Sequence, residues 1–229
     1  MMAVFLKALF PPADVGKVDT SLRYTDILFG FVIKELFLRL QNWQQLDSPI
    51  KWHLVVGTTL VLGSWVGFRR SVHRAQYEVK FFNLPFFKFI ADQLMLIIYF
   101  RVAVLTDTDL KKPMPPAADL AAHTVKLVTV VFALYLAWDV LGILMAKAKD
   151  IPGWKVWKYA KVVEQKATDQ PADPNWIGTV ITLVCLAVSS VVSCKAESRS
   201  IGPTPLFILA TATLLVYRLA KEVRTSCRT

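Results

Sequence analysis

The feature that most constrains this chain is a series of apolar runs, each close to or above the length needed to cross a lipid bilayer. A helix rises about 1.5 Å per residue, so about 17–25 apolar residues span the hydrocarbon core of a membrane. Six such runs follow one another between polar connections, at residues 24–40, 52–68, 81–105, 122–146, 176–194 and 203–220. We therefore expect an all-α fold, a polytopic membrane bundle of six transmembrane helices.

The composition agrees with a membrane protein and argues against nucleic-acid binding. The chain has 229 residues, of which 55% are hydrophobic and 12% aromatic, and its formal net charge is +10. The basic residues gather in the connections between apolar runs, where anionic lipid headgroups would meet them. We expect a lipid bilayer with anionic headgroups as the partner of this charge, and no nucleic acid.

The distribution of Lys and Arg predicts the orientation of the bundle. Cytoplasmic connections are enriched in these residues. Most of them lie at residues 1–23, in the loops at 69–80 and 147–175, and in the tail at 222–229, whereas the other connections hold only Lys51, Lys111, Lys112, Lys195 and Arg199. Both termini are therefore expected to be cytoplasmic. This gives an N-terminal or interfacial segment at 1–23, a bundle at 24–221 with basic inner loops, a short tail, and a multi-pass location in a bacterial inner membrane or an equivalent membrane.

The first apolar run carries an unusual number of charges. An ionised side chain at the bilayer centre costs about 2.5–3.5 kcal/mol, so it normally faces protein or water. At about 100° per residue, the run has two stripes that should avoid lipid. One stripe consists of Arg23, Asp26, Gly30 and Lys34, and the other of Phe31, Glu35 and Leu38.

Charges also lie inside the later runs, and their depths suggest partners. Counting residues from the cytoplasmic ends of the helices brings Asp26 level with Arg218, Lys34 near Asp92, and Lys88 near Asp139. These residues are expected either to form interhelical ion pairs or to serve conduction or proton coupling. The sequence leaves both interpretations open.

No enzyme motif is present in the sequence. It has neither a glycine-rich phosphate loop nor a Gly-x-Ser-x-Gly turn. His53, His73 and His123 lie at the edges of apolar segments, outside any metal-ligand pattern, and we expect them at the membrane interface. We predict a protein that is not an enzyme and uses no metal or other cofactor.

A short motif near the start of the first run resembles a known family. Tyr24-Thr25-Asp26, followed by an apolar helix, resembles the Phe-Ser-Asp signature of the endolysosomal potassium channel family and its short bacterial six-helix relatives. Tyr replaces Phe and Thr replaces Ser, while Asp is kept. The resemblance covers about the first 90 residues and continues at Trp65, Arg69, Arg70 and Asn83-Leu84.

This resemblance implies a tetramer whose first helices surround a pore for potassium and similar monovalent cations, with an apolar constriction. Phe31, Glu35 and Leu38 would then line the pore, and Tyr24, Thr25 and Asp26 would hold the first helix against its neighbours. The chain departs from the family at Lys34 and Glu35, where small or apolar residues are usual, and at the end of the second run, where Arg replaces His. A ring of Glu35 carboxylates favours cations unless Arg39 neutralises it.

Three functions are compatible with these observations. The first is a homo-oligomeric cation channel of the potassium type, with the first helix lining the pore. The second is a non-conducting membrane subunit that anchors or senses a cytoplasmic protein partner through its basic inner loops. The third is a proton-coupled carrier that uses Asp92 and Asp139.

Overall fold

The computed structural model describes residues 20–74, 84–105, 116–148 and 176–226. These residues form six long helices, α2 (Thr20–Leu40), α3 (Ser48–Arg74), α4 (Leu84–Val104), α5 (Ala117–Ala148), α6 (Trp176–Glu197) and α7 (Pro203–Ser226), and a short 3₁₀ turn, η1 (Trp43–Gln45). Each helix covers one of the predicted apolar runs, except that α4 begins three residues after the start of its run. The all-α fold and the six helices are therefore confirmed. The expected basic loops and the N-terminal segment lie mostly outside the described residues.

Local sequence signals explain where several helices begin. Ser48 and Pro49 open α3, and Pro203 and Pro205 lie in the first turn of α7, where proline is tolerated because the first N–H groups have no helical acceptor. The backbone N–H of Leu120 donates to Pro116 at 2.9 Å at the start of α5. These prolines mark the boundaries between the apolar runs.

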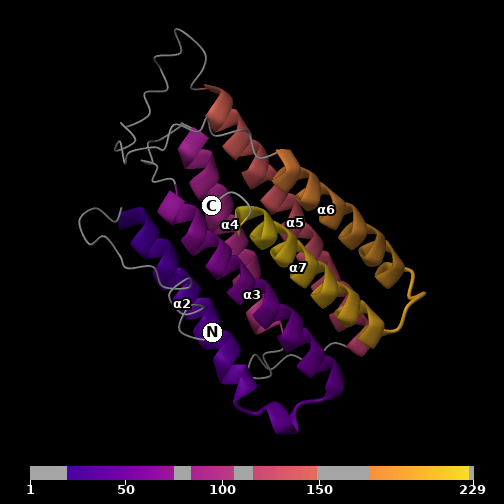
Figure 1. The fold of residues 1–229 in the computed structure, drawn as a ribbon. Helices are drawn as coiled ribbons and strands as arrows, with labels where there is room; N and C mark the ends of the chain where they lie inside the picture. Colours follow the sequence, from indigo (N-terminus) through magenta and orange to yellow (C-terminus); the bar gives the residue numbers. More distant parts are fainter. Residues whose placement is uncertain (1–19, 75–83, 106–115, 149–175, 227–229) are drawn as a thin grey trace.

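The connection between α6 and α7 is a tight turn whose N–H groups donate hydrogen bonds to carbonyls in the last turn of α6. Arg199 has a left-handed φ of 52°, and its N–H donates to the carbonyl of Ala196 at 3.1 Å. The N–H of Ser200 reaches the carbonyl of Lys195 at 3.3 Å, which satisfies another carbonyl at the helix end. This short turn makes α6 and α7 antiparallel neighbours, as the ribbon shows (Figure 1).

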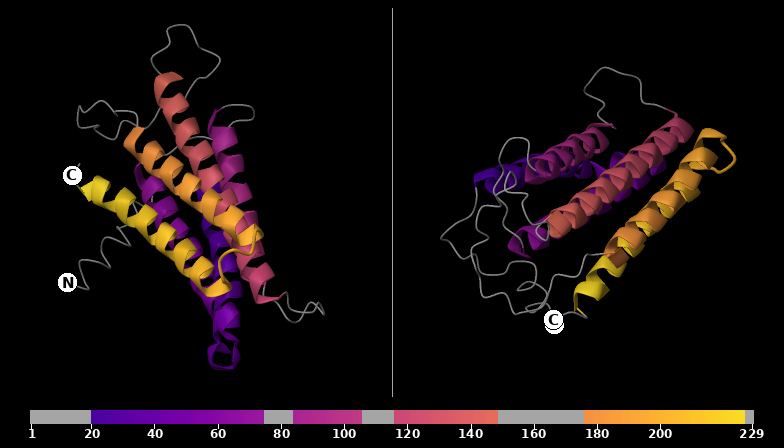
Figure 2. Two further views of the ribbon diagram at one scale, coloured as in Figure 1. Left: turned by 90° about the vertical axis from the view of Figure 1, so that its right-hand side faces the viewer. Right: turned by 90° about the horizontal axis from the view of Figure 1, so that it is seen from above.

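The helices form an up-and-down bundle in which α3 and α5 are central (Figure 1). Helix α3 packs against α2, α4, α5 and α7, and α5 packs against α3, α4, α6 and α7. Helices α2 and α6 lie at opposite edges, and each packs mainly on two neighbours. A view from above shows α6 and α7 side by side along one flank of the bundle (Figure 2).

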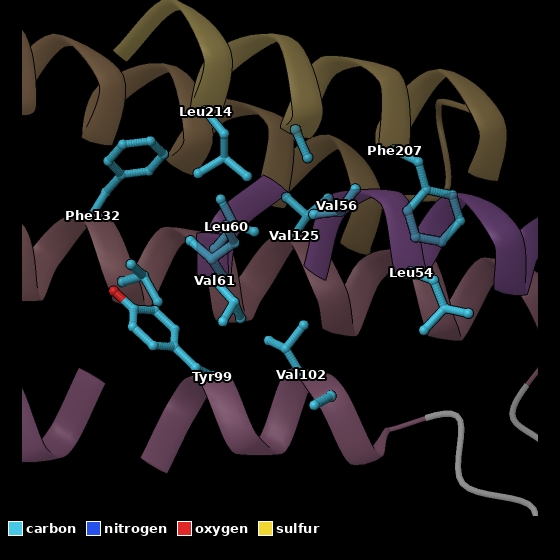
Figure 3. Close-up of a cluster of buried hydrophobic side chains, with 14 of the residues drawn as sticks. Leu54, Val56, Leu60, Val61, Tyr99, Val102, Val125, Phe132, Phe207 and Leu214 are labelled. Carbon is cyan, nitrogen blue, oxygen red and sulfur yellow. The ribbon is translucent and has the colours of Figure 1, made fainter. Parts of the chain in front are cut away.

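The core is built from the inner faces of α3, α4, α5 and α7. Leu54 and Leu60 of α3, Val102 of α4, Phe132 of α5 and Phe207 of α7 are at most 1% exposed and point into the same region (Figure 3). Helix α6 joins this core through a stripe of mostly small residues, Gly178, Thr182, Cys185, Ser189, Val192 and Ala196. Small residues at alternating spacings of four and three let α6 approach α5 closely.

The surface of the bundle is apolar on several helices. Ile97 of α4, Val184 of α6 and Val216 of α7 are more than half exposed, although each is an apolar aliphatic side chain. Two helices are long and apolar enough to cross a membrane, the segment Ala117–Leu144 within α5 and the whole of α6. Helix α4 is as apolar on average as α5 but contains Lys88, Asp92 and Arg101, and α2 contains five charged residues.

Candidate functional site

Most of the charged and polar side chains of the interior lie in one half of the bundle, whereas His53 and Thr124 are buried in the other half. The first of these halves contains the start of α2, α4 and α6 and the end of α3, α5 and α7, which antiparallel packing brings together. It is the half that the distribution of Lys and Arg predicts to be cytoplasmic. Six of its side chains are at most 8% exposed, although each is polar or charged: Thr25, Ser64, Lys88, Asp92, Asp139 and Thr182.

Arg218 of α7 binds hydroxyl groups and aromatic rings in this half. Its Nη2 donates to Ser64 Oγ and to the Tyr135 hydroxyl, both at 3.1 Å. Its Cζ lies 5.5 Å from the ring centroids of Tyr135 and Tyr217, and these two rings stack at 5.3 Å. The rings contribute a cation–π attraction to the guanidinium group. We call Ser64, Tyr99, Tyr135, Tyr217 and Arg218 the arginine cluster.

The hydroxyl protons of the arginine cluster can be assigned in sequence. Ser64 donates its single proton to the carbonyl of Leu60 at 2.6 Å, so in the close contact between Ser64 and Tyr135 the tyrosine is the donor. Tyr99 then donates to the Tyr135 hydroxyl at 2.9 Å. This series of hydrogen bonds ends at the backbone carbonyl of Leu60, which cannot pass a proton on. The cluster is therefore a fixed scaffold around Arg218 rather than a proton pathway.

Two glycines of α3 leave room for the guanidinium group. A Cβ placed on Gly63 would lie 3.2 Å from Nε of Arg218, and one placed on Gly67 would lie 3.1 Å from Cζ and closer still to Nη1. The spacing Gly63-x-x-x-Gly67 is a sequence signal for close approach between helices. This spacing marks the site on α3 where Arg218 packs, whereas the comparison of depths placed Arg218 beside Asp26.

Asp139 of α5 forms an ion pair with Lys221 of α7. Lys221 Nζ lies 3.0 Å from Oδ1 and 2.9 Å from Oδ2, and Thr182 Oγ1 donates to Oδ2 at 2.6 Å. The side chains of Asp139 and Lys221 are 5% and 23% exposed. The Asp139 carboxylate on α5 therefore accepts hydrogen bonds from Thr182 on α6 and from Lys221 on α7, and it links these three helices.

Lys88 of α4 lies over the aromatic ring of Trp138 of α5. Its Nζ lies 3.8 Å from the centroid of the Trp138 ring, and both Asp92 and Asp139 act electrostatically on it. Asp139 is hydrogen-bonded by Lys221, a partner that the depth comparison did not identify, and Lys88 lies near both Asp92 and Asp139. Lys88 and Asp92 are nonetheless both buried, at 8% and 7% exposure.

The expected partner of Asp26 is also corrected. Arg69 Nη1 donates to Asp26 Oδ2 at 2.7 Å, and Trp65 Nε1 donates to Oδ1 at 3.3 Å. Arg218 lies at a similar level, but it contacts the arginine cluster. Asp26, Trp65 and Arg69 all belong to the set of residues on which the family resemblance rests, and the fold brings them together.

The outer face of α2 contains three of the residues singled out from the sequence. Phe31 and Leu38 are 57% and 44% exposed, and Lys34 is also exposed, so all three share this face. The two-stripe prediction separated Lys34 from Phe31 and was wrong on this point. No ion pair of Lys34, with Asp92 or any other carboxylate, occurs among the described residues.

Glu35 lies at the edge of this outer face and is neutralised by Arg39. Arg39 Nη1 donates to Glu35 Oε2 at 3.0 Å and to the backbone carbonyl of Glu35 at 2.7 Å. The Glu35 side chain is 26% exposed. On the same helix, Tyr24 is 51% exposed, whereas Thr25 is 2% exposed and accepts a 3.4 Å hydrogen bond from Gln93.

His53 of α3 lies in the interior of the bundle. It is fully buried, and its Nε2 donates to the carbonyl of Val102 at 2.8 Å while Nδ1 lies 2.8 Å from Thr124 Oγ1. Val102 belongs to the last turn of α4, whose carbonyls have no helical donor. His53 therefore caps α4 from α3, and within the described residues no group of three or more possible metal ligands is found.

Comparisons with known proteins give no relative. No family model, no curated protein and no solved structure matches this chain.

Proposed function

We propose that the protein is an integral membrane bundle of six spanning helices whose copies assemble through the outer face of α2 around a pore for monovalent cations. The membrane part of the proposal is supported by the inverted distribution of side chains. Polar and charged residues such as Asp139, Lys88 and Thr182 are buried, while aromatic and aliphatic side chains cover the outside. Such an exterior suits hydrocarbon rather than water.

The observation that carries the pore proposal is the division of α2 into two faces. Its inner face is fixed by buried residues, Thr25, Phe29, Val32 and Leu36, and by the bonds of Asp26 to α3. Its outer face is apolar apart from Lys34, and α2 lies at an edge of the bundle. A lysine surrounded by exposed apolar side chains is costly in lipid, so a second protein surface or water beside it lowers that cost.

The family resemblance supplies the specific form of the proposal. It implies a tetramer with Phe31 and Leu38 as the apolar constriction, and both side chains are free to face a shared axis. Glu35 contributes less to cation preference than a lone carboxylate would, because Arg39 neutralises it. Charge selection in this pore then depends on the balance between Lys34 and the Glu35–Arg39 pair.

The ion pair between Glu35 and Arg39 also favours a second candidate function. If Glu35 serves only to bind Arg39, the outer face of α2 has one positive charge and no negative one, which suits a protein contact better than a cation path. The chain would then be a non-conducting membrane subunit. Its partner would be a cytoplasmic protein that binds the basic inner loops.

The test is ion flux in liposomes containing the purified, assembled protein, with separate potassium, sodium and chloride gradients. Phe31→Ser should raise the flux, because a polar side chain wets an apolar constriction. Phe100→Ser is the matched control, since Phe100 is 46% exposed but lies on α4. An assembled oligomer that passes no ions as wild type or as Phe31→Ser would rule out the pore and favour the subunit.

Charge variants on α2 test the selectivity separately. Arg39→Gln frees the Glu35 carboxylate and should raise the preference for potassium over chloride, whereas Glu35→Gln should lower it. Lys34→Gln removes a cation from the face and should act in the same direction as Arg39→Gln. Equal permeability ratios in all three variants would show that this face does not meet permeating ions.

A further inference from the structure

Arg218 is a cation without a carboxylate partner in the described part of the bundle. Arg69 pairs with Asp26 at 2.7 Å and Lys221 with Asp139 at 2.9 Å. The contacts of Arg218 are instead neutral, namely hydroxyl oxygens and ring faces. Neutral dipoles stabilise a buried cation but leave its net charge in place, so this position attracts an anion.

The guanidinium group also has donors that the protein does not use. Both of its hydrogen bonds come from Nη2, and Nε and Nη1 have no acceptor among the described residues. Arg218 as a whole is only partly buried. Nε and Nη1 lie over Gly63 and Gly67, which are only partly buried.

The position of Arg218 over Gly63 and Gly67 suits the headgroup region of a membrane. Arg218 lies two residues before the predicted cytoplasmic end of the run at 203–220, where lipid phosphates approach the bundle. Leu215 and Leu219 on the same helix are 49% and 60% exposed and offer apolar surface for acyl chains. Arginine is the side chain best suited to binding phosphate through several N–H donors.

We propose that Arg218, whose guanidinium group lies against Gly63 and Gly67, binds a phosphate group through its unused donors, and that the headgroup of an anionic phospholipid supplies this phosphate. This rests on the proposed membrane location but not on ion conduction. The lipid would neutralise Arg218 and stabilise the contact between α3 and α7. Inorganic phosphate has the same chemistry and is the alternative source.

The experiment uses the full chain purified in an uncharged detergent, with binding measured by native mass spectrometry and by thermal unfolding. The probes are phosphatidylglycerol, a diacylglycerol with the same acyl chains, and inorganic phosphate. Phosphatidylglycerol should bind and raise the unfolding temperature, and diacylglycerol should do so much less. Arg218→Gln should weaken phosphatidylglycerol binding by about tenfold or more, as expected for the loss of a charged hydrogen bond.

Gly63→Ala keeps the arginine but displaces its side chain, because the new Cβ would lie 3.2 Å from Nε, and it should also weaken phosphatidylglycerol binding. Gly142→Ala is its control, because nothing lies within 4 Å of a Cβ at Gly142. Lys126→Gln, at an exposed lysine whose side chain is 66% exposed, controls for general attraction to anionic lipid. If Arg218→Gln does not fold, Gly63→Ala and its control still decide the question.

The outcomes separate the possible explanations. An Arg218-dependent effect of inorganic phosphate equal to that of phosphatidylglycerol would keep the phosphate site and assign it to a soluble source. Equal binding of diacylglycerol, or phosphatidylglycerol binding that survives both Arg218→Gln and Gly63→Ala, would overturn the proposal. Because the measurement is made in detergent, a failure to conduct ions in liposomes leaves its result unaffected.

Discussion

Replacing Gly67 by alanine should destabilise the bundle by displacing Arg218. The new Cβ would lie 3.1 Å from Cζ and 3.5 Å from Nη2, and closer to Nη1, so the guanidinium group must move away from α3. That movement breaks the two hydrogen bonds from Nη2 to Ser64 and Tyr135, each at 3.1 Å. Hydrogen bonds to charged groups contribute about 1.5–3 kcal/mol each.

The helix itself gains from the same substitution. Alanine is favoured over glycine inside a helix by about 1 kcal/mol, so the net loss of stability should be about 2 kcal/mol or more. Gly142→Ala should give the same gain in helix stability without a steric clash, because nothing lies within 4 Å of a Cβ at this position. We expect this control to be neutral or slightly stabilising, which puts the two variants about 3 kcal/mol apart.

The assay is unfolding by a denaturing detergent, followed by circular dichroism and tyrosine and tryptophan fluorescence. A double-mutant cycle with Arg218→Met identifies the cause, since Gly67→Ala should cost nothing once the guanidinium group is absent. An equal cost in both backgrounds, or a Gly67→Ala variant as stable as Gly142→Ala, would refute the argument.

Three further predictions follow from the contacts and the topology. Asp139→Asn should destabilise the protein by about 3 kcal/mol because it removes the carboxylate that Lys221 and Thr182 bind, and Lys221→Met in the same chain should recover part of the loss in thermal unfolding. Asp26→Asn should cost only about 1 kcal/mol in the same measurement, since the pair with Arg69 is about one-third exposed and solvent screens it. Labelling of single cysteines should report one side of the membrane at residues 75, 160 and 226 and the opposite side at 117 and 196, and labelling of 75 and 117 from the same side would contradict six spans.

The helices could be predicted from the sequence because they depend on local properties. Apolar length and the prolines near 49, 116 and 203 are enough to separate the six runs, and each run became a helix. Lys88, Asp92 and Asp139 are buried as expected and Arg218 is partly buried, because an ionised side chain within an apolar run has few stable positions other than the bundle interior. Lys34 is the exception, and its exposure follows from the position of α2 at the edge of the bundle.

The partners of those charges were not predictable from depth. Depth fixes the level of a residue along the bundle axis, whereas pairing also requires that its helix be a neighbour and be rotated toward the partner. Asp26 and Arg218 are at a similar level, but α2 packs on α3 and α4, so Arg69 of α3 is the cation within reach. For Asp139, both Lys88 and Lys221 lie on neighbouring helices, and the rotation of α7 gives the hydrogen bonds to Lys221.

The arginine cluster explains why α7 has this rotation. Arg218 can approach α3 only where side chains are missing, and the two glycines four residues apart provide such a place on one face of α3. Once Arg218 lies there, Lys221, three residues later on α7, is turned toward α5 and reaches Asp139. Tyr217 precedes Arg218 and stacks on Tyr135 of α5, which adds a second constraint on the same rotation. The glycine pair on α3 therefore determines which lysine neutralises Asp139, through a helix that contains neither glycine.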